Sequence, residues 1–135
     1  MNESLAESSG PLILLVEDNE RNARLMAEIL LTNGYRLNLA TDGLQAIEAA
    51  RTLHPDLILM DLQLPLLDGL TATTRLRADP ATAGIPIVAL TAHAMAEHRE
   101  RLLDAGCCSY ISKPISYRSF LEEISHVLRD QLQPV

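Results

Sequence analysis

Five polar side chains follow four apolar segments of this chain, and their types suit phosphate chemistry with a divalent cation. Glu17 and Asp18 follow one segment, Asp61 a second, Thr91 a third and Lys113 a fourth. Three carboxylates at one place repel one another and require a cation, and oxygen ligands suit Mg²⁺ better than zinc. A hydroxyl and an ammonium can hold the other oxygens of a phosphoryl group. The set predicts that Asp61 is a nucleophile that accepts a phosphoryl group as an acyl phosphate.

The elements that must position these residues alternate along the chain. Apolar runs of strand length alternate with segments of helical periodicity and with turn residues. Helix-length crossovers between apolar strands predict a parallel sheet that is covered on both faces. Ligands of such a sheet bind outside the carboxyl ends of its strands, which is where the five polar residues fall. The predicted strands are 12–16, 36–40, 56–60, 87–90 and 109–112, and the predicted helices are 19–33, 43–53, 68–78, 94–105 and 116–129.

Lys113 is the only lysine of the chain, since the other basic residues are all arginines. A lysine is a compact, mobile point charge, whereas an arginine is a planar fork. A single lysine at one strand end, followed by Pro114, therefore supports a site role over that of a solvated surface charge.

Composition and charge exclude several classes of function. The 135 residues carry 11 Lys and Arg against 18 Asp and Glu, a net charge of -7, which disfavours binding to nucleic acid. No segment is apolar and long enough to span a membrane, and the start of the chain does not resemble a signal peptide. The two cysteines, Cys107 and Cys108, are neighbours and form no long-range staple, so we expect a reducing cytoplasm.

Four motifs together resemble the receiver domain of two-component response regulators. The motifs are LILLVEDN, LILMDLQLPLLDG, IVALTA and YISKPIS, in this order along the chain. The likeness spans about residues 11–130 and is strongest to single-domain regulators of the DivK kind. It implies a CheY-like (flavodoxin-like) three-layer α/β sandwich with five helices and a five-stranded parallel sheet in the order 2-1-3-4-5. We expect a lead at 1–10 and a tail at 131–135.

The resemblance also implies a role for each residue of the site. Asp61 is the phosphoacceptor, Asp18 binds Mg²⁺ directly, and Glu17 holds the ion through water. Gln63 gives its backbone carbonyl to the metal, while Thr91 and Lys113 bind phosphoryl oxygens. Two further expectations are that Tyr110 is the switch aromatic and that the bond before Pro114 is cis. Gln63 and His93 occupy the positions that tune the lifetime of the phosphate in the family.

The implied function is a signalling switch that catalyses only its own phosphorylation and dephosphorylation. The phosphodonor is a sensor histidine kinase or a histidine phosphotransfer protein. The surface of helix 94–105, strand 109–112 and helix 116–129 then controls a downstream protein partner. One alternative is that the chain is a receiver fragment of a hybrid histidine kinase.

A second alternative is a haloacid-dehalogenase-like, Mg²⁺-dependent phosphatase. Such phosphatases carry an acid two residues after the nucleophile, and Gln63 cannot act as one. A dinucleotide-binding protein is disfavoured because no glycine-rich loop follows the first strand.

Plainer structural interpretations exist for several of these residues. Asp18 and Thr91 could each cap a helix, and Tyr110 could be an ordinary strand aromatic. Asp68 and Gly69 suit a turn and a cap with no role in the site. Cys107 and Cys108 suit small buried thiols better than a redox pair, and His93 and His98 suit exposed helix positions better than metal ligands.

Overall fold

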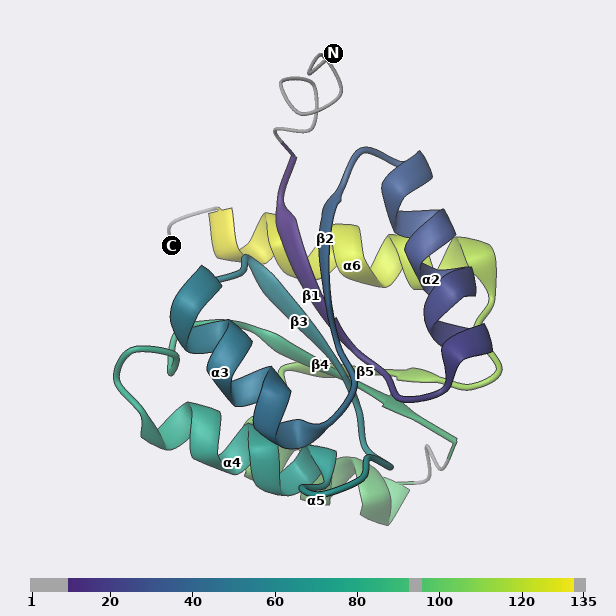
Figure 1. The fold of residues 1–135 in the computed structure, drawn as a ribbon. Coiled ribbons are helices and arrows are strands. Elements are labelled where there is room, and N and C mark those ends of the chain that lie inside the picture. Colours follow the sequence, from purple (N-terminus) through teal and green to yellow (C-terminus); the bar gives the residue numbers. More distant parts are fainter. Residues whose placement is uncertain (1–9, 93–95, 133–135) are drawn as a thin grey trace.

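The structure is a computed structural model that describes residues 10–92 and 96–132. The described residues form one five-stranded sheet in the order β2-β1-β3-β4-β5, in which every pairing is parallel. They also form five helices, so the predicted three-layer sandwich is confirmed (Figure 1). The strands are β1 (Leu12–Val16), β2 (Arg36–Ala40), β3 (Leu57–Asp61), β4 (Ile87–Thr91) and β5 (Ser109–Ser112); the helices are α2 (Glu20–Thr32), α3 (Gly43–Leu53), α4 (Gly69–Ala78), α5 (Ala96–Ala105) and α6 (Tyr117–Leu132).

The helices cover the two faces of the sheet unequally. Helices α2 and α6 lie on one face, and α3, α4 and α5 lie on the other (Figure 1). Met26 and Phe120 are fully buried in the core beneath α2 and α6, and Ala46 and Leu76 in the core beneath α3 to α5. Side chains of one strand alternate between these cores because successive residues point to opposite faces. Strands β1, β3 and β4 are consequently apolar, apart from Asp61 and Thr91 at the ends of β3 and β4.

Helix α3 buries only part of the face that its apolar spacing predicts. That spacing places Leu44, Ile47, Ala50 and Leu53 on one face of the helix. Ala50 is fully buried and Ile47 packs against the core, but the side chains of Leu44 and Leu53 are 50% and 38% exposed. Gly43 and Ala46 are buried as well. The helical period was predicted correctly, and the buried face was predicted in part.

The ends of the elements also differ from the sequence prediction in places. Asp61 and Thr91 are the last residues of β3 and β4, whereas they were expected just after the strands. Helix α6 extends to Leu132, so the first two residues of the expected tail at 131–135 are helical. Most of the expected lead at 1–10, the rest of that tail and His93 lie outside the described residues.

Asparagine and aspartate residues cap the helices that begin at the carboxyl edge of the sheet. The side chains of Asn19, Asp42 and Asp68 accept hydrogen bonds from the first turns of α2, α3 and α4. These bonds satisfy backbone N–H groups that have no partner inside a helix. The cap of α2 is therefore Asn19, which leaves the exposed carboxylate of Asp18 available for another role.

Candidate functional site

Three acidic side chains converge at the carboxyl edge of the sheet. Glu17 follows β1, Asp61 ends β3, and the register pairs Val16 with Met60, so the two acids extend from adjacent positions. Oxygen atoms of Glu17, Asp18 and Asp61 lie within 4.8 Å of one another. Glu17 and Asp61 are buried and Asp18 is exposed. This arrangement is an all-oxygen cluster that is open to solvent on one side, which suits a cation that retains some of its water.

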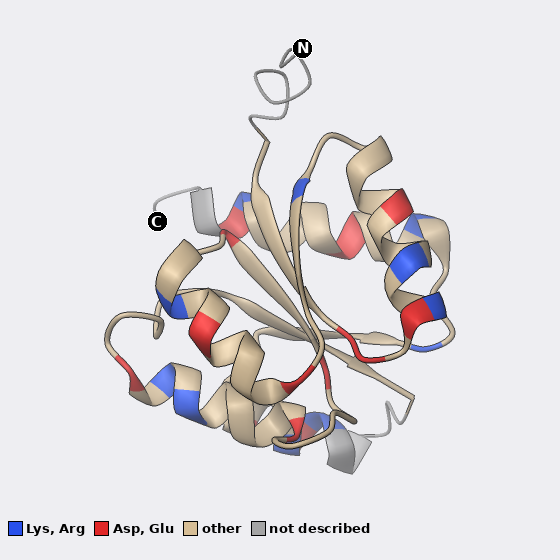
Figure 2. Ribbon diagram, in the orientation of Figure 1, with Lys and Arg blue, Asp and Glu red and all other residues tan. Residues whose placement is uncertain are grey.

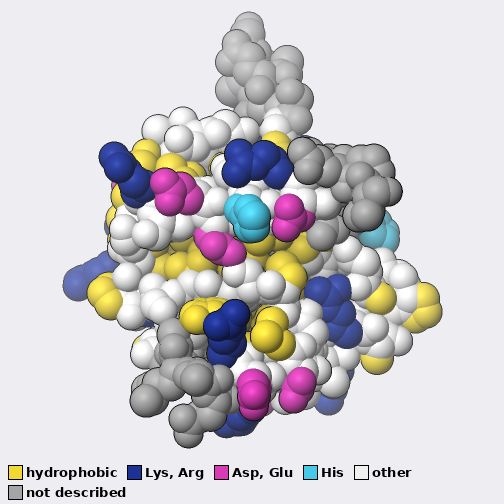
Figure 3. All heavy atoms as spheres, turned by 180° about the vertical axis from the view of Figure 1, so that it is seen from behind, with side chains coloured by type: hydrophobic (Ala, Val, Ile, Leu, Met, Phe, Trp, Pro, Cys, Tyr) yellow, Lys and Arg dark blue, Asp and Glu magenta, His cyan; other side chains and the backbone are white. Residues whose placement is uncertain are grey.

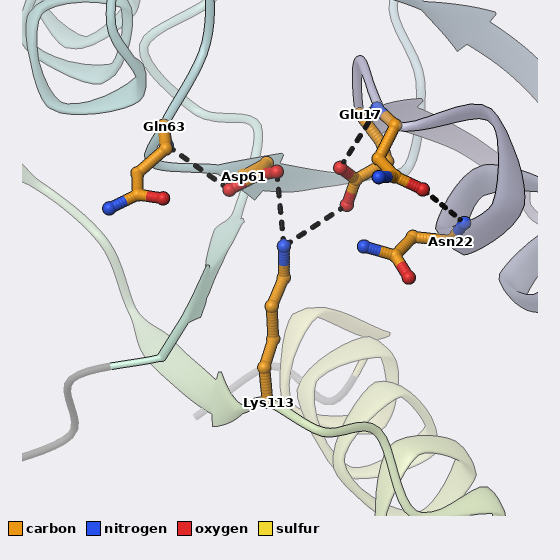
Figure 4. A network of polar contacts seen from close by, with 6 residues as sticks. Glu17, Asn22, Asp61, Gln63 and Lys113 are labelled. Atoms are coloured by element: carbon orange, nitrogen blue, oxygen red, sulfur yellow. Dashed lines mark hydrogen bonds and ion pairs between the residues drawn. The ribbon is translucent and has the colours of Figure 1, made fainter.

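Lys113 lies between the two buried carboxylates (Figure 4). Its Nζ is 3.1 Å from Asp61 Oδ2 and 3.4 Å from Glu17 Oε1. Two ion pairs thus hold the chain's single lysine at the centre of the site. The Lys113–Pro114 peptide bond is cis.

The backbone around the site extends the sheet ladder by one residue at three strand ends. The N–H groups of Glu17, Leu62 and Lys113 donate to the carbonyl oxygens of Ala40, Leu90 and Thr91 at 3.0, 3.3 and 2.8 Å. Because these bonds lie at the strand ends, they fix the residues that carry the site chemistry. The side chains are thereby oriented by the rigid sheet rather than by a loop.

Backbone N–H groups also orient both buried carboxylates (Figure 4). The N–H of Gln63 donates to Asp61 Oδ1 at 3.1 Å, and the N–H of Asn19 donates to Glu17 Oε2 at 3.3 Å. Asp61 Oδ1 therefore accepts a backbone bond while Oδ2 faces Lys113. The Gln63 side chain is exposed.

The charges in the site do not balance, and the pKa of Glu17 reflects this. Burial raises the pKa of the Glu17 carboxyl from 4.5 to about 7, with a further contribution from the neighbouring Asp61 carboxyl and an opposing one from Lys113. Burial alone would lower the pKa of Lys113, but hydrogen bonding and attraction to Asp61, together with Glu17, raise it instead. Lys113 therefore stays charged while Glu17 is only weakly acidic, so the site is short of positive charge.

A cavity of about 130 Å³ opens beside Asp61. Thr91 and Lys113 line it together with Asp61, so the cavity brings the predicted hydroxyl and ammonium to the predicted nucleophile. Thr91 is only 4% exposed at the end of β4. The remaining lining residues are Leu62, Gln63, Leu70, Leu90 and Ala92.

Tyr110 lies on β5 and is half-buried against the core beneath α3, α4 and α5. The register pairs it with Ala89, two residues before Thr91 on the neighbouring strand. Tyr110 is therefore near the cavity without lining it.

Gly69 is a supporting residue that sequence reasoning dismissed. Its N–H donates to the Leu62 carbonyl at 3.0 Å, and a Cβ at this position would overlap the backbone carbonyl of Asp61. Helix α4 can begin directly against the strand that carries Asp61 only because residue 69 has no side chain. Asp68 acts as the predicted cap, and its hydrogen bond from the Thr71 backbone lowers the pKa of its carboxyl. The glycine after a capping aspartate was the available signal in the sequence.

The cysteines and histidines lie apart from this cluster as far as the structure describes them. Cys107 is buried in the core and Cys108 is exposed, which corrects the expectation of two buried thiols. Burial raises the pKa of Cys107 to about 11 and also raises that of Cys108, which opposes thiolate chemistry at both. His98 belongs to α5, and its side chain is not described.

Comparison with known proteins decides the family. Residues 13–125 match the family described as "Response regulator receiver domain". The chain belongs to the response regulator receiver domains. The polar-differentiation response regulator DivK of Brucella ovis is 45% identical over 118 residues, which are 87% of this chain and 96% of that protein. The corresponding protein of Brucella anthropi is 44% identical over the same share of each chain.

Solved structures of receiver domains support the same assignment. The receiver domain of a sensor histidine kinase from Pseudomonas aeruginosa PAO1 is 41% identical and superposes with a TM-score of 0.79, covering 91% of this chain and 98% of that one. That structure has a magnesium ion coordinated in its active-site cleft. A response regulator from Chloroflexus aurantiacus is 27% identical with a TM-score of 0.85, covering 90% and 99%.

A receiver domain is a phosphoacceptor switch of two-component signalling rather than an enzyme with a separate substrate. The match excludes the phosphatase alternative, and it implies a cognate histidine kinase. Within the described part of this receiver domain, no helix has the length and apolar character needed to cross a membrane.

Proposed function

We propose that Asp61 is the phosphoacceptor of this receiver domain and that a sensor histidine kinase or a histidine phosphotransfer protein is the donor. The observation that carries the proposal is the position of Asp61, which is buried, paired with Lys113 and clustered with Glu17 and Asp18. In the transfer, the P–N bond of a phosphohistidine breaks and a bond forms between phosphorus and an Asp61 carboxylate oxygen. The imidazole nitrogen keeps the electron pair and takes up a proton.

The three acids are the groups that would hold Mg²⁺. The oxygen-only donors, their mutual repulsion and the raised pKa of Glu17 all fit a divalent cation. The homologous receiver domain of Pseudomonas aeruginosa coordinates magnesium in its cleft. In the proposed assignment, Asp18 and Asp61 ligate the ion directly, Glu17 acts through water, and Gln63 contributes its backbone carbonyl. The ion would neutralise charge on the phosphoryl oxygens.

Two residues that line the cavity would bind the transferred group. Lys113 already contacts Asp61 and would pair with one phosphoryl oxygen, and the Thr91 hydroxyl would donate to another. Asp61 and Thr91 are both 4% exposed, and low exposure to water strengthens such electrostatic interactions.

The conformational signal would begin at Thr91. Movement of Thr91 toward the phosphoryl group vacates space near β5, into which Tyr110 can turn. The surface of helix 94–105, strand 109–112 and helix 116–129 would then present the state to a downstream protein partner. A cytoplasmic setting follows for a protein that meets the kinase at its phosphorylated histidine. Two predictions stand for the protein to which this receiver domain belongs: a single-domain regulator, or a hybrid histidine kinase.

Intact-mass analysis tests the acceptor. With Mg²⁺ and acetyl phosphate, the wild-type chain should gain one phosphoryl mass and Asp61→Asn should gain none. Asp104→Asn is the matched control, because Asp104 is an exposed acid on α5 and should leave the adduct unchanged. Full phosphorylation of Asp61→Asn would show that another residue is the acceptor.

A further inference from the structure

The loop between β3 and α4 exposes one leucine, whereas its three other leucines are partly buried. Leu62, Leu64 and Leu67 pack against the core beneath α3, α4 and α5. Leu66 lies at the tip and is 79% exposed, the largest value for any large hydrophobic side chain in the described residues. The exposure is therefore specific to one position and is not a general property of the loop.

The backbone at Leu66 is strained. Its φ is +67°, a region that leucine rarely adopts, and the N–H of Leu67 donates to the Pro65 carbonyl across it at 2.7 Å. A bond between residues i+2 and i closes a γ-turn, and the form with positive φ is the strained one. Glycine or asparagine would adopt this turn at lower cost. Leu66 thus combines backbone strain with an exposed apolar side chain, and such strain clusters at functional sites.

Hydrogen bonds and close packing connect this loop to the proposed phosphorylation site. The N–H of Gln63 bonds the Asp61 carboxylate at one end of the loop, and the N–H of Gly69 bonds Leu62 at the other. The start of α3 also packs against the loop, because a Cβ at Gly43 would overlap the Leu67 carbonyl. Figure 1 shows this loop leaving the carboxyl end of β3. Leu66 therefore belongs to a loop that starts at the proposed acceptor, at the edge of the sheet that a phosphodonor must approach.

We propose that Leu66 is an apolar anchor for the protein that donates the phosphoryl group, a proposal that rests on Asp61 being the acceptor. A phosphohistidine brings negative charge toward a chain of net charge -7, in which Lys113 and a bound Mg²⁺ would offset only the three carboxylates of the site itself. Long-range electrostatics therefore oppose the encounter, and apolar burial is a source of affinity that does not depend on charge. The partner surface should carry an apolar side chain next to its phosphorylated histidine. Small donors such as acetyl phosphate need no anchor.

Comparing a protein donor with a small donor tests the anchor. The protein donor is a purified histidine kinase chosen because it phosphorylates the wild-type chain. Leu66→Asn relaxes the turn and removes the apolar group, and Leu66→Met keeps an apolar side chain. We expect Leu66→Asn to lower kcat/KM for the kinase roughly tenfold or more, chiefly through KM, while its rate with acetyl phosphate stays within about twofold of wild type. Leu66→Met should retain most of the kinase rate.

Leu31→Asn is the control for exposure alone, since Leu31 is 57% exposed on α2 and distant in sequence from the loop. It should leave transfer from the kinase unchanged. Equal losses with both donors would overturn the proposal by placing the effect in the pocket, and an unchanged kinase rate in Leu66→Asn would overturn it outright. Sedimentation velocity tests a different role for Leu66. If the wild type self-associates and Leu66→Asn does not, Leu66 contacts a second copy of the chain and not the donor, which would also overturn the proposal. Phosphoryl transfer from the kinase to Asp61→Asn would refute Asp61 as the acceptor, and this result is distinct from a failure of the Leu66 anchor.

Discussion

Replacing Glu17 with glutamine should stabilise the metal-free protein at high pH. The Glu17 carboxyl is 1% exposed and lies beside Asp61, with a pKa of about 7 against an ordinary 4.5. The folded state therefore holds a proton at Glu17 that the unfolded state has already released between these two pH values. The free energy of unfolding falls as pH rises through this window, and the penalty is complete above pH 7. Glutamine has nearly the same shape and carries no charge to bury.

The size of the effect follows from the shift. One pKa unit corresponds to about 1.4 kcal/mol, so the full penalty is at most about 3 kcal/mol at pH 8. At pH 5 the same relation gives a penalty of only roughly 1 kcal/mol, because Glu17 is still protonated in the folded state. Glu17→Gln should exceed wild type in stability by these amounts in EDTA. Saturating Mg²⁺ at pH 8 should reduce or reverse the difference, since the cation binds the wild-type carboxylate and stabilises the folded state.

Urea unfolding followed by far-UV circular dichroism measures the difference, because the chain has no tryptophan for fluorescence. Glu48→Gln is the matched control, since Glu48 is exposed on α3 and its replacement should change little at either pH. Equal stability of Glu17→Gln and wild type at pH 8 in EDTA would refute the reasoning. A difference that is larger at pH 5 than at pH 8 would refute it as well, because the sign of the linkage would be wrong.

Three further outcomes follow from the site. Asp18→Asn should leave the metal-free protein as stable as wild type or slightly more so, and it should lose most of the rise in Tm on adding Mg²⁺; an equal rise in both would place the metal elsewhere. Thr91→Ala should still be phosphorylated at Asp61, while its backbone NMR shifts with beryllofluoride should stay near the pocket rather than reach 94–118; wild-type shifts in the variant would exclude Thr91 as the coupling residue. Gly69→Ala should lower the free energy of unfolding by roughly 1–3 kcal/mol in urea titrations and slow phosphorylation, because its Cβ displaces the Asp61 carbonyl; wild-type values for both would contradict the packing argument.

The location of the site was predictable from the sequence because one rule of sheet geometry decides it. In a parallel sheet, residues that follow consecutive strands meet at a single edge. Placing Glu17, Asp61 and Lys113 at strand ends was therefore enough to bring them together before any distance was known. The strand order came from the family resemblance, and the structure confirms it.

Features that depend on packing were harder to predict from the sequence. The exposure of Leu44 and Leu53 on α3 could not be predicted from their spacing, because the packing of the helix in the folded chain decides how much of its apolar face is buried. Leu66 gave no signal of a positive φ, since leucine normally avoids that region. The raised pKa of Glu17 likewise depends on burial and on Asp61, which only the folded chain supplies.

The excess of negative charge in the site separates two ways in which a substitution can abolish signalling. Lys113 offsets one of three clustered carboxylates, so the metal-free pocket is a net destabilising feature that the two apolar cores must outweigh. Neutralising Glu17 or Asp18 removes repulsion and should disable the switch without unfolding it. Enlarging Gly69 disturbs the support beneath Asp61 and should cost both stability and phosphorylation. The sign of the stability change therefore reports whether a lost response arises from the chemistry of the pocket or from the scaffold that holds it.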